Sequence, residues 1–442
     1  MKLWVVPFLL AMVAHAIAQT EADSRCEPNA LNRLATENYD TSVWFSLDRF
    51  RALEGDCVPG PHAYSYQSYR GQLESFVGNH TAALSYYDPA SPLNSSREFS
   101  APVTSVPAVE YVTESARDHR IVMVNERHHA SSDRLLTMEL LAPLAEQGFR
   151  YLAIEAGWNG DPLNSRGYPI PQTGYYVNDV VFAELVRAAI KLGYRIIAYE
   201  EQDEQKTSAE TSAMNPQERR DWWQARNIAT RVFDIERDAK LLVHAGYDHI
   251  RESRTDNWAP MAHFLRQFTG LDPLTVSQTA YSERSRPERE HPLRRKAREL
   301  GLLGDEAIVL VDSEGESVIP PPATVDLAVL GISTRYANGR PTWMEMGGRR
   351  QETAFDTPEC AARTCIVEAR RAGFVDEVPL DRVEVTNAES TTLYLPAGED
   401  IVVKVMGLDQ STLATRHIYV ADPETRILGS SVTWAEESRK IQ

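Results

Sequence analysis

The densest group of reactive side chains is the run Asn125-Glu126-Arg127-His128-His129, which directly follows the apolar stretch Ile121 to Val124. In an extended chain, side chains two residues apart point the same way, because they alternate with period two. Glu126 and His128 can therefore act on one bound molecule. A carboxylate and an imidazole placed together can take a proton from water, which is the chemistry of a hydrolase.

Three more apolar runs end in a carboxylate or an imidazole. Leu152-Ala153-Ile154 precedes Glu155, Ile196-Ile197-Ala198-Tyr199 precedes Glu200 and Glu201, and Leu241-Leu242-Val243 leads through His244 to Asp248 and His249. If these runs are parallel strands, their carboxyl ends meet at the edge where α/β proteins bind ligands. We therefore expect Glu155 and His249 to join the first pair in one site. For Glu200 and Glu201, simple exposure to solvent is the alternative interpretation. The remaining histidines of interest are interpreted as structural: His129, His244 and His263.

Apolar β-branched runs alternate with helical patterns along the middle of the chain. The runs cover residues 121–124, 151–154, 195–199, 241–243, 274–278, 307–311 and 327–330, and the helical patterns cover 135–144, 180–192, 222–239 and 258–269. Alternation of this kind predicts a mostly parallel sheet with helices on both faces. The expected fold class is therefore α/β.

Other parts of the chain have different patterns. Residues 1–18 combine Lys2, an apolar run and small residues at cleavage spacing, which predicts a signal peptide. Residues 19–107 form an aromatic-rich helical segment that ends in a proline-rich linker, and 375–442 show the short alternating runs of a β-rich module. The α/β core is assigned to 108–374. A length of 442 residues accommodates two or three such domains.

Composition limits the partners of the protein. The chain has 46 basic and 63 acidic side chains and a formal charge of -17. An acidic protein of this kind is repelled by nucleic acid and by anionic membranes, and no run after the leader reaches the ~18 apolar residues of a membrane span. We expect an exported protein, periplasmic or secreted, that acts on a small molecule or a peptide. The oligomeric state is left open.

Four cysteines lie in two separate regions, Cys26 and Cys57 near one end and Cys360 and Cys365 toward the other. In an oxidising compartment an even number of cysteines favours disulfide bonds. Local pairing, Cys26 with Cys57 and Cys360 with Cys365, is the preferred arrangement. A four-cysteine metal site is the weaker interpretation, because no two cysteines have the close CxxC spacing of such sites.

The familiar motifs GxSxG, HExxH, GxxxxGKS/T and GxGxxG are absent, so serine hydrolases with a nucleophile elbow, zincins and nucleotide-binding proteins have no local support. The runs Asn125-Glu126-Arg127-His128 and Gly246-Tyr247-Asp248-His249 instead resemble the paired GxxH motifs of the superfamily that unites TIKI proteases, TraB/PrgY proteins, erythromycin esterases and haem-binding ChaN-like proteins. The intervening order agrees, with Glu155 after a strand and Arg226 on a helix. The resemblance covers roughly residues 121 to 339. Asn125 stands where the family usually has glycine, and asparagine tolerates a left-handed turn better than most residues.

The resemblance implies an erythromycin-esterase-like or ChaN-like core whose site is formed by Glu126, His128, Glu155, Arg226 and His249. Such a site can hydrolyse an ester, lactone or peptide bond in two ways. Without a metal, Glu126 or His128 accepts a proton from water while Arg226 or His249 stabilises the oxyanion. With zinc or manganese, the ligands are His128, Glu155 and His249, and Glu126 is the base.

Two other functions stay open at this point. The haem-binding relatives suggest a protein that holds haem iron through Tyr199 or a histidine, although the carboxylates at this edge would need partners in a haem pocket. A non-catalytic scaffold is the third alternative, supported by the N-terminal helices and the C-terminal β module. The cofactor is left undetermined between none, a divalent metal and haem.

Overall fold

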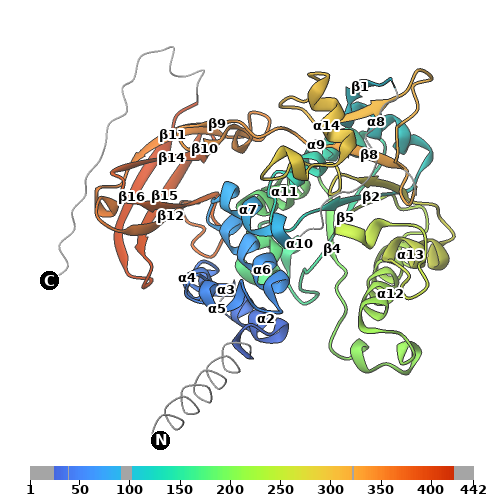
Figure 1. The fold of residues 1–442 in the computed structure, drawn as a ribbon, viewed down its shortest axis with the longest axis horizontal. Coiled ribbons are helices and arrows are strands. Elements are labelled where there is room, and N and C mark those ends of the chain that lie inside the picture. Colours follow the sequence, from blue (N-terminus) through green and yellow to red (C-terminus); the bar gives the residue numbers. More distant parts are fainter. Residues whose placement is uncertain (1–23, 38, 91–101, 321–322, 423–442) are drawn as a thin grey trace, which may run out of the picture.

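The structure is a computed structural model that describes residues 24–37, 39–90, 102–320 and 323–422. The expected signal peptide and most of the expected linker lie outside the described residues. Three parts are visible in Figure 1, namely a group of N-terminal helices, a large α/β core and a C-terminal β-rich region. Within the described residues, no helix is both long enough and apolar enough to cross a membrane.

An eight-stranded sheet forms the centre of the α/β core, with strand order β1-β7-β8-β6-β2-β5-β3-β4. The strands from β8 to β4 run parallel to one another. At one edge, β7 pairs antiparallel with β8, and β1 pairs antiparallel with β7. The bounds are β1 Thr104–Pro107, β2 Ile121–Glu126, β3 Tyr151–Ile154, β4 Arg195–Ala198, β5 Leu241–Gly246, β6 Leu274–Ser277, β7 Ile308–Val311 and β8 Leu327–Leu330. The mostly parallel sheet expected from the sequence is confirmed.

Helices cover both faces of this sheet because its strands are apolar on both sides. In β2, Val122 and Val124 pack into one core, and Ile121 and Met123 pack into the other, as period-two alternation requires. The first core includes α8 (Ala108–Ser115), α9 (Asp133–Glu146) and α11 (Val180–Lys191), and the second includes α12 (Pro216–Ile228) and α13 (Met261–Thr269). A smaller cluster joins α14 (Pro292–Glu299) to β7 and β8.

The long helix expected at 222–239 differs from the structure. α12 begins at Pro216, behind Asn215, whose side chain accepts a hydrogen bond from the Glu218 backbone N–H at 3.0 Å. It ends at Ile228 and is followed by a π-helical turn, Ala229–Phe233. An N-cap residue followed by proline is a known helix start, but the apolar pattern used to place this helix begins later. The earlier start adds a full turn before residue 222.

The N-terminal helices form a group that contains the Cys26–Cys57 disulfide. They are α2 (Pro28–Thr36), α3 (Tyr39–Ser42), α4 (Phe45–Ala52), α5 (Glu54–Cys57), α6 (Ala63–Phe76) and α7 (His80–Ala90). The turn between α6 and α7 uses Gly78 at φ 77°, and a Cβ there would lie 2.9 Å from the Arg382 carbonyl oxygen. Residues of this group pack against Ile366 and Met406 of the β-rich region. In Figure 1, α6 and α7 lie between the two larger parts of the molecule.

The C-terminal region is antiparallel, as expected. One sheet has four strands in the order β13 (Asp381–Thr386), β12 (Thr364–Arg371), β15 (Glu399–Gly407) and β16 (Thr412–Val420). In a second sheet, β11 (Gln351–Asp356) pairs with β14 (Ser390–Leu395). A short hairpin is formed by β9 (Tyr336–Ala337) and β10 (Arg340–Pro341). Cys360 and Cys365 are disulfide-bonded here, so both expected pairings are confirmed. The region begins before the expected boundary at 375, because β11 and β12 pair with its strands. β11 is largely polar, so the apolar alternation that predicts strands is weak there.

Candidate active site

Three neighbouring parallel strands deliver polar residues to one edge of the sheet. β2 ends at Glu126, β3 is followed directly by Glu155, and β5 ends at Gly246. The next turn, Tyr247–Ile250, carries His249. The register pairs Glu126 of β2 with Gly246 of β5. The carboxyl ends of these strands therefore meet, and the side chains that follow them lie close enough to interact.

The expected pair of Glu126 and His128 is formed. Nδ1 of His128 lies 2.8 Å from Oε1 of Glu126, whose side chain is only 1% exposed. Burial alone would raise the pKa of this carboxyl, but Arg134, His244 and the hydrogen bond from His128 hold it well below its ordinary value. Glu126 is therefore a fixed negative charge that orients the ring. This leaves His128 as the base of the pair.

Two aromatic rings and a glycine determine where the His128 ring lies. It stacks on Tyr176 with ring centroids 3.9 Å apart and meets the edge of Tyr247 at 5.0 Å. A Cβ on Gly246 would lie 2.4 Å from both Cε1 and Nε2 of His128, so glycine is needed at this position. Nε2 has no hydrogen-bonding partner among the described residues, and the ring lines a pocket. The second nitrogen of His128 is thus available to a bound molecule.

Behind this pair lies a buried ionic network that no pattern in the sequence predicts. Nε of Arg134 lies 2.6 Å from Oε2 of Glu126, and its Nη1 lies 3.0 Å from Oδ2 of Asp179. Nε2 of His244 lies 3.0 Å from the same Glu126 oxygen, and Thr137 holds the other nitrogen of His244 at 2.9 Å. His244 is buried, as expected of a structural histidine, and it also helps to fix Glu126.

Glu155, which directly follows β3, binds an arginine of α12. Its Oε1 lies 2.8 Å from Nη2 of Arg220, and its Oε2 accepts the Gly246 backbone N–H. Arg220 also binds both carboxylate oxygens of Glu200, at 2.8 and 2.6 Å. Burial would raise the pKa of Glu155, but the positive groups around it, led by His249 and Arg220, lower it to about 2. Glu155 is ionised at neutral pH, and Glu200 belongs to the same ion-pair group.

His249 forms a second imidazole–carboxylate pair. Its Nδ1 lies 2.5 Å from Oδ1 of Asp221, a fully buried carboxylate that also accepts the Trp258 indole N–H at 2.8 Å. Its Nε2 lies 3.1 Å from Nη1 of Arg220 and 3.6 Å from Oε1 of Glu155. Burial would lower the pKa of His249, but Asp221 and Glu155 raise it above its ordinary value. A neutral ring can accept a hydrogen bond from Arg220, and a protonated ring can donate toward Glu155.

The structure does not bring Arg226 into this group. Arg226 lies on α12 but is exposed, with its guanidinium 5.5 Å from the centre of the Phe268 ring. Arg220 and Arg226 are six positions apart, and such positions lie on different faces of a helix with 3.6 residues per turn. Arg220 lies at the sheet edge, where the family resemblance placed Arg226.

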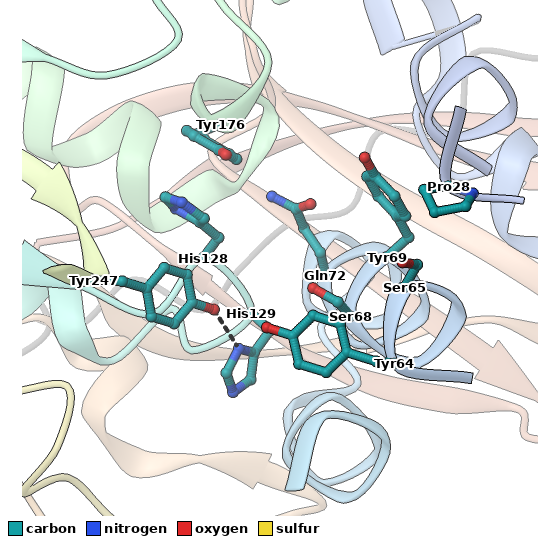
Figure 2. Close-up of a pocket in the computed structure, with 10 residues that line it drawn as sticks. All are labelled: Pro28, Tyr64, Ser65, Ser68, Tyr69, Gln72, His128, His129, Tyr176 and Tyr247. Atoms are coloured by element: carbon teal, nitrogen blue, oxygen red, sulfur yellow. Dashed lines mark hydrogen bonds between the residues drawn. The ribbon is translucent and has the colours of Figure 1, made fainter. Parts of the chain in front are cut away.

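A pocket of about 250 Å³ opens at His128 (Figure 2). Its lining residues are Pro28, Tyr64, Ser65, Ser68, Tyr69, Gln72, His128, His129, Tyr176 and Tyr247. One wall is formed by His128, which follows β2, and by Tyr176 of the short helix Tyr176–Asn178. The opposite wall comes largely from α6, with Gln72 and several hydroxyl groups. The N-terminal helices, expected as a separate segment, therefore form part of the candidate site.

The donor set does not fit the metal expected as one alternative. Among the residues that the structure describes, no group of three or more histidine, cysteine, aspartate or glutamate side chains could hold a metal ion. The guanidinium of Arg220 lies against Oε1 of Glu155 and Nε2 of His249, two of the atoms that would have to bind zinc or manganese. A divalent cation would be repelled by this positive charge. His128, the third expected ligand, is held by Glu126.

Tyr199, considered as a haem ligand, does not reach the pocket. It is fully buried, and its hydroxyl donates to the His244 carbonyl oxygen at 3.1 Å. The pocket volume of about 250 Å³ is also below the ~300–1,000 Å³ typical of ligand and cofactor sites. The pocket therefore fits a small chemical group better than a macrocycle.

The low pKa of Glu155 leads to a prediction about acid stability. A carboxyl whose pKa is depressed on folding stabilises the folded state above its unfolded pKa, and this contribution is lost as the pH falls through the folded pKa. For Glu155 we expect the loss between its ordinary value of 4.5 and about 2. Glu155→Gln should be less stable at neutral pH and lose less stability on acidification, which denaturant titrations across this pH range would measure.

Glu314→Gln is the matched control, because Glu314 is exposed in a turn. Its free energy of unfolding should follow that of the wild type at every pH. If Glu155→Gln loses stability with acid as steeply as the wild type does, the pKa assigned to Glu155 is wrong.

Comparisons with known proteins found little. No family model matches the chain, and no curated protein matches it. Among solved structures, the type III effector HopBA1 is 15% identical, with a TM-score of 0.33 over 53% of this chain and 98% of that one. The RRSP effector domain of a MARTX toxin from Vibrio vulnificus CMCP6 is 14% identical, with a TM-score of 0.29 over 53% of this chain and 51% of that one. The C-terminal region of Pasteurella multocida toxin, described as having a thiol-protease-like catalytic triad, is 10% identical, with a TM-score of 0.29 over 86% and 61%. Likenesses this weak carry no argument about function.

Proposed function

We propose that the protein is a hydrolase that activates water on an ester, lactone or peptide bond without a metal. The observation that carries the proposal is the pair of Glu126 and His128, in which a buried, ionised carboxylate holds one nitrogen of an imidazole that lines a pocket. This is the arrangement of a general base oriented by a carboxylate. The motif resemblance to the TIKI, TraB, erythromycin esterase and ChaN-like superfamily supports the same reading.

In the proposed reaction, Nε2 of His128 takes a proton from water while the water oxygen attacks the carbonyl carbon. Glu126 stays ionised and stabilises the imidazolium that forms. The tetrahedral intermediate carries its negative charge on the former carbonyl oxygen. Arg220 lies at the same sheet edge, outside the lining of the pocket, and its side chain is 28% exposed. In this scheme it is the positive group that stabilises the oxyanion.

The pair of Asp221 and His249 supplies the second proton. The raised pKa of His249 helps this ring to keep a proton. Nε2 of His249 gives the proton to the leaving oxygen or nitrogen as the bond to the carbonyl carbon breaks. After the reaction His128 carries one extra proton and His249 lacks one. Exchange with solvent restores both rings, so the net reaction consumes one water.

Asp221→Asn should move the alkaline limb of the kcat/KM profile to lower pH. Asp221 is the principal charge that raises the pKa of His249, so without it the ring loses its proton at a lower pH. Asp221 does not touch the substrate in this scheme and is a positioning residue. A purely structural role would lower the rate at every pH and leave the limb in place.

Asp248→Asn is the control for this profile. Asp248 neighbours His249 in sequence, but its side chain is largely exposed and pairs at 3.5 Å with Arg251. We expect the Asp248→Asn profile to match that of the wild type. An alkaline limb that stays fixed in Asp221→Asn would remove His249 from the proposed proton transfer.

The proposed activity is tested by incubating the purified full chain with panels of esters, lactones and peptides, before and after treatment with EDTA. We expect hydrolysis of at least one substrate and turnover that survives chelation. A chain that hydrolyses nothing across the panels is not the hydrolase proposed. Activity that disappears with EDTA and returns with zinc or manganese would contradict the metal-free mechanism. A Soret band with stoichiometric haemin would favour the haem-binding alternative.

We also propose that the protein works outside the cytoplasm, in the periplasm or as a secreted protein. Its two disulfides fit an oxidising compartment. Disulfides in such compartments persist, whereas cytosolic thiols are kept reduced. The substrate would then be a small molecule or peptide met after export.

A further inference from the structure

A second pocket lies beside the edge strand β4. Its volume is about 300 Å³, and it shares no lining residue with the pocket at His128. Ile154 and Ala198, the last residues of β3 and β4, are part of its lining. Arg195, the first residue of β4, also lines it, so the pocket runs along the edge strand and reaches the carboxyl ends of β3 and β4, the edge where open α/β sheets bind ligands.

Two arginines in this lining have no acidic partner. Arg195 and Arg231 both line the pocket, and neither forms an ion pair with a residue in the described part of the chain. Burial lowers the pKa of Arg231, and no nearby carboxylate offsets this effect. The acidic residue of the lining, Asp161, is already bound by Arg166 through two contacts of 2.7 Å. The pocket thus carries uncompensated positive charge in a protein of net charge -17.

The guanidinium of Arg231 is held at one end only. Its Nη1 donates to Oδ1 of Asn159 and to the Ala198 carbonyl oxygen. Neither contact uses Nε or Nη2, and an arginine with two free donors can bind a carboxylate or a phosphate in bidentate fashion. Nδ2 of Asn159 is buried and lacks a hydrogen-bonding partner among the described residues. A further donor is therefore left next to the arginine.

Exposed apolar side chains line the same pocket. Trp158 is 56% exposed and Ile235 is 65% exposed. The indole N–H of Trp158 donates to the Tyr39 hydroxyl at 2.6 Å, which restricts the ring. An indole with its polar atom already bonded offers an apolar surface to a ligand. The pocket combines this surface with the unpaired guanidinium.

We propose that this second pocket binds a small organic anion, with its carboxylate or phosphate on Arg231 and its apolar or aromatic part against Trp158. The site is separate from the proposed hydrolysis and uses none of its residues. Its volume of about 300 Å³ lies at the lower end of the ~300–1,000 Å³ range of ligand pockets. A one-ring or short-chain anion is the class of ligand that fits.

Calorimetric titration of the full chain tests this site with four probes, namely phenyl phosphate, benzoate, inorganic phosphate and the neutral benzyl alcohol. We expect one of the two aromatic anions to bind. Binding of phenyl phosphate indicates a phosphate site, and binding of benzoate indicates a carboxylate site. Arg231→Gln should weaken that binding by about ten- to a hundredfold, because it removes a charge-assisted bidentate contact. Arg226→Gln is the matched control, because it removes the same charge from an exposed position outside the pocket.

Trp158→Ala is the second variant, at a largely exposed side chain, and circular dichroism verifies its fold. It should weaken binding of the aromatic anion and leave inorganic phosphate unaffected. The proposal is overturned if neither aromatic anion binds, if Arg226→Gln weakens binding as much as Arg231→Gln does, or if benzyl alcohol binds as tightly as the anions. Inorganic phosphate that binds as tightly as phenyl phosphate would overturn the role given to Trp158.

Discussion

His128→Ala is expected to lower kcat/KM for hydrolysis by about 10²–10⁴ while the protein stays folded. The ring is the group in the pocket with one nitrogen held by a buried carboxylate and the other available to water. Glu126 cannot take over as the base, because its pKa is held well below its ordinary value and it binds protons too weakly. Steady-state kinetics on the best substrate of the panel, with circular dichroism to verify the fold, would measure the loss.

His417→Ala is the control for this experiment, because His417 is exposed on β16. It should hydrolyse the substrate at the wild-type rate. Full activity in His128→Ala would show that the proton is taken by another group and that the pocket at His128 is not the active site.

Arg134→Met is expected to destabilise the fold by about 3–5 kcal/mol, the cost of removing one partner from a buried ion pair. Arg134 is fully buried between Glu126 and Asp179. Methionine retains part of the packing volume but leaves two carboxylates without their cation. Urea denaturation, followed by fluorescence and circular dichroism, would give the free energy of unfolding.

Arg117→Met is the matched control, because Arg117 and its partner Glu114 are both exposed. Exposed pairs contribute ~0–1 kcal/mol, so this variant should unfold close to the wild type. Equal effects of the two substitutions would mean that the network behind Glu126 does not stabilise the protein.

The sheet could be predicted because its strands are continuous apolar runs, such as Leu241 to Val243, separated by helical patterns. The structure extends β2 to Glu126 and β5 to Gly246, so the strands end later than their apolar residues do. Period-two alternation predicts that Glu126 and His128 converge, and the two side chains do meet. β2 ends at Glu126, however, and His128 lies in the turn that follows, so this turn also determines the contact. The start of the β-rich region is not evident in the sequence, because β11 is largely polar and pairs with β14, a strand far along the chain.

Residues that depend on tertiary packing were not found from the sequence. Arg134 lies on α9, and it reaches Glu126 only because that helix packs back onto β2. The sequence pattern does not single out Arg220 and Asp221, because its apolar residues place the helix at 222–239, although Asn215 and Pro216 signal the true start. These contacts are set by how helices pack on the sheet, which no local pattern records.

Asn125, where the family usually has glycine, shows how a motif position can change its role. It is a buried residue of β2, whose Nδ2 donates to the Tyr247 carbonyl oxygen at 2.7 Å and whose Oδ1 accepts the Gln278 backbone N–H at 2.8 Å. The expected left-handed turn is not at Asn125. It occurs at Tyr247 and at Ala156, with φ of 42° and 54°. Both follow residues of the candidate site, where unusual backbone conformations tend to cluster.

The most direct test of the proposed mechanism is the coupling between Glu126 and His128. It is measured as kcat/KM of Glu126→Gln, His128→Ala and the double variant on one substrate. If the carboxylate acts by orienting the imidazole, the double variant should be about as slow as His128→Ala alone, because residues that act as a unit are strongly non-additive. Losses that multiply in the double variant would show that the two side chains act independently, and the general-base pair proposed here would be wrong.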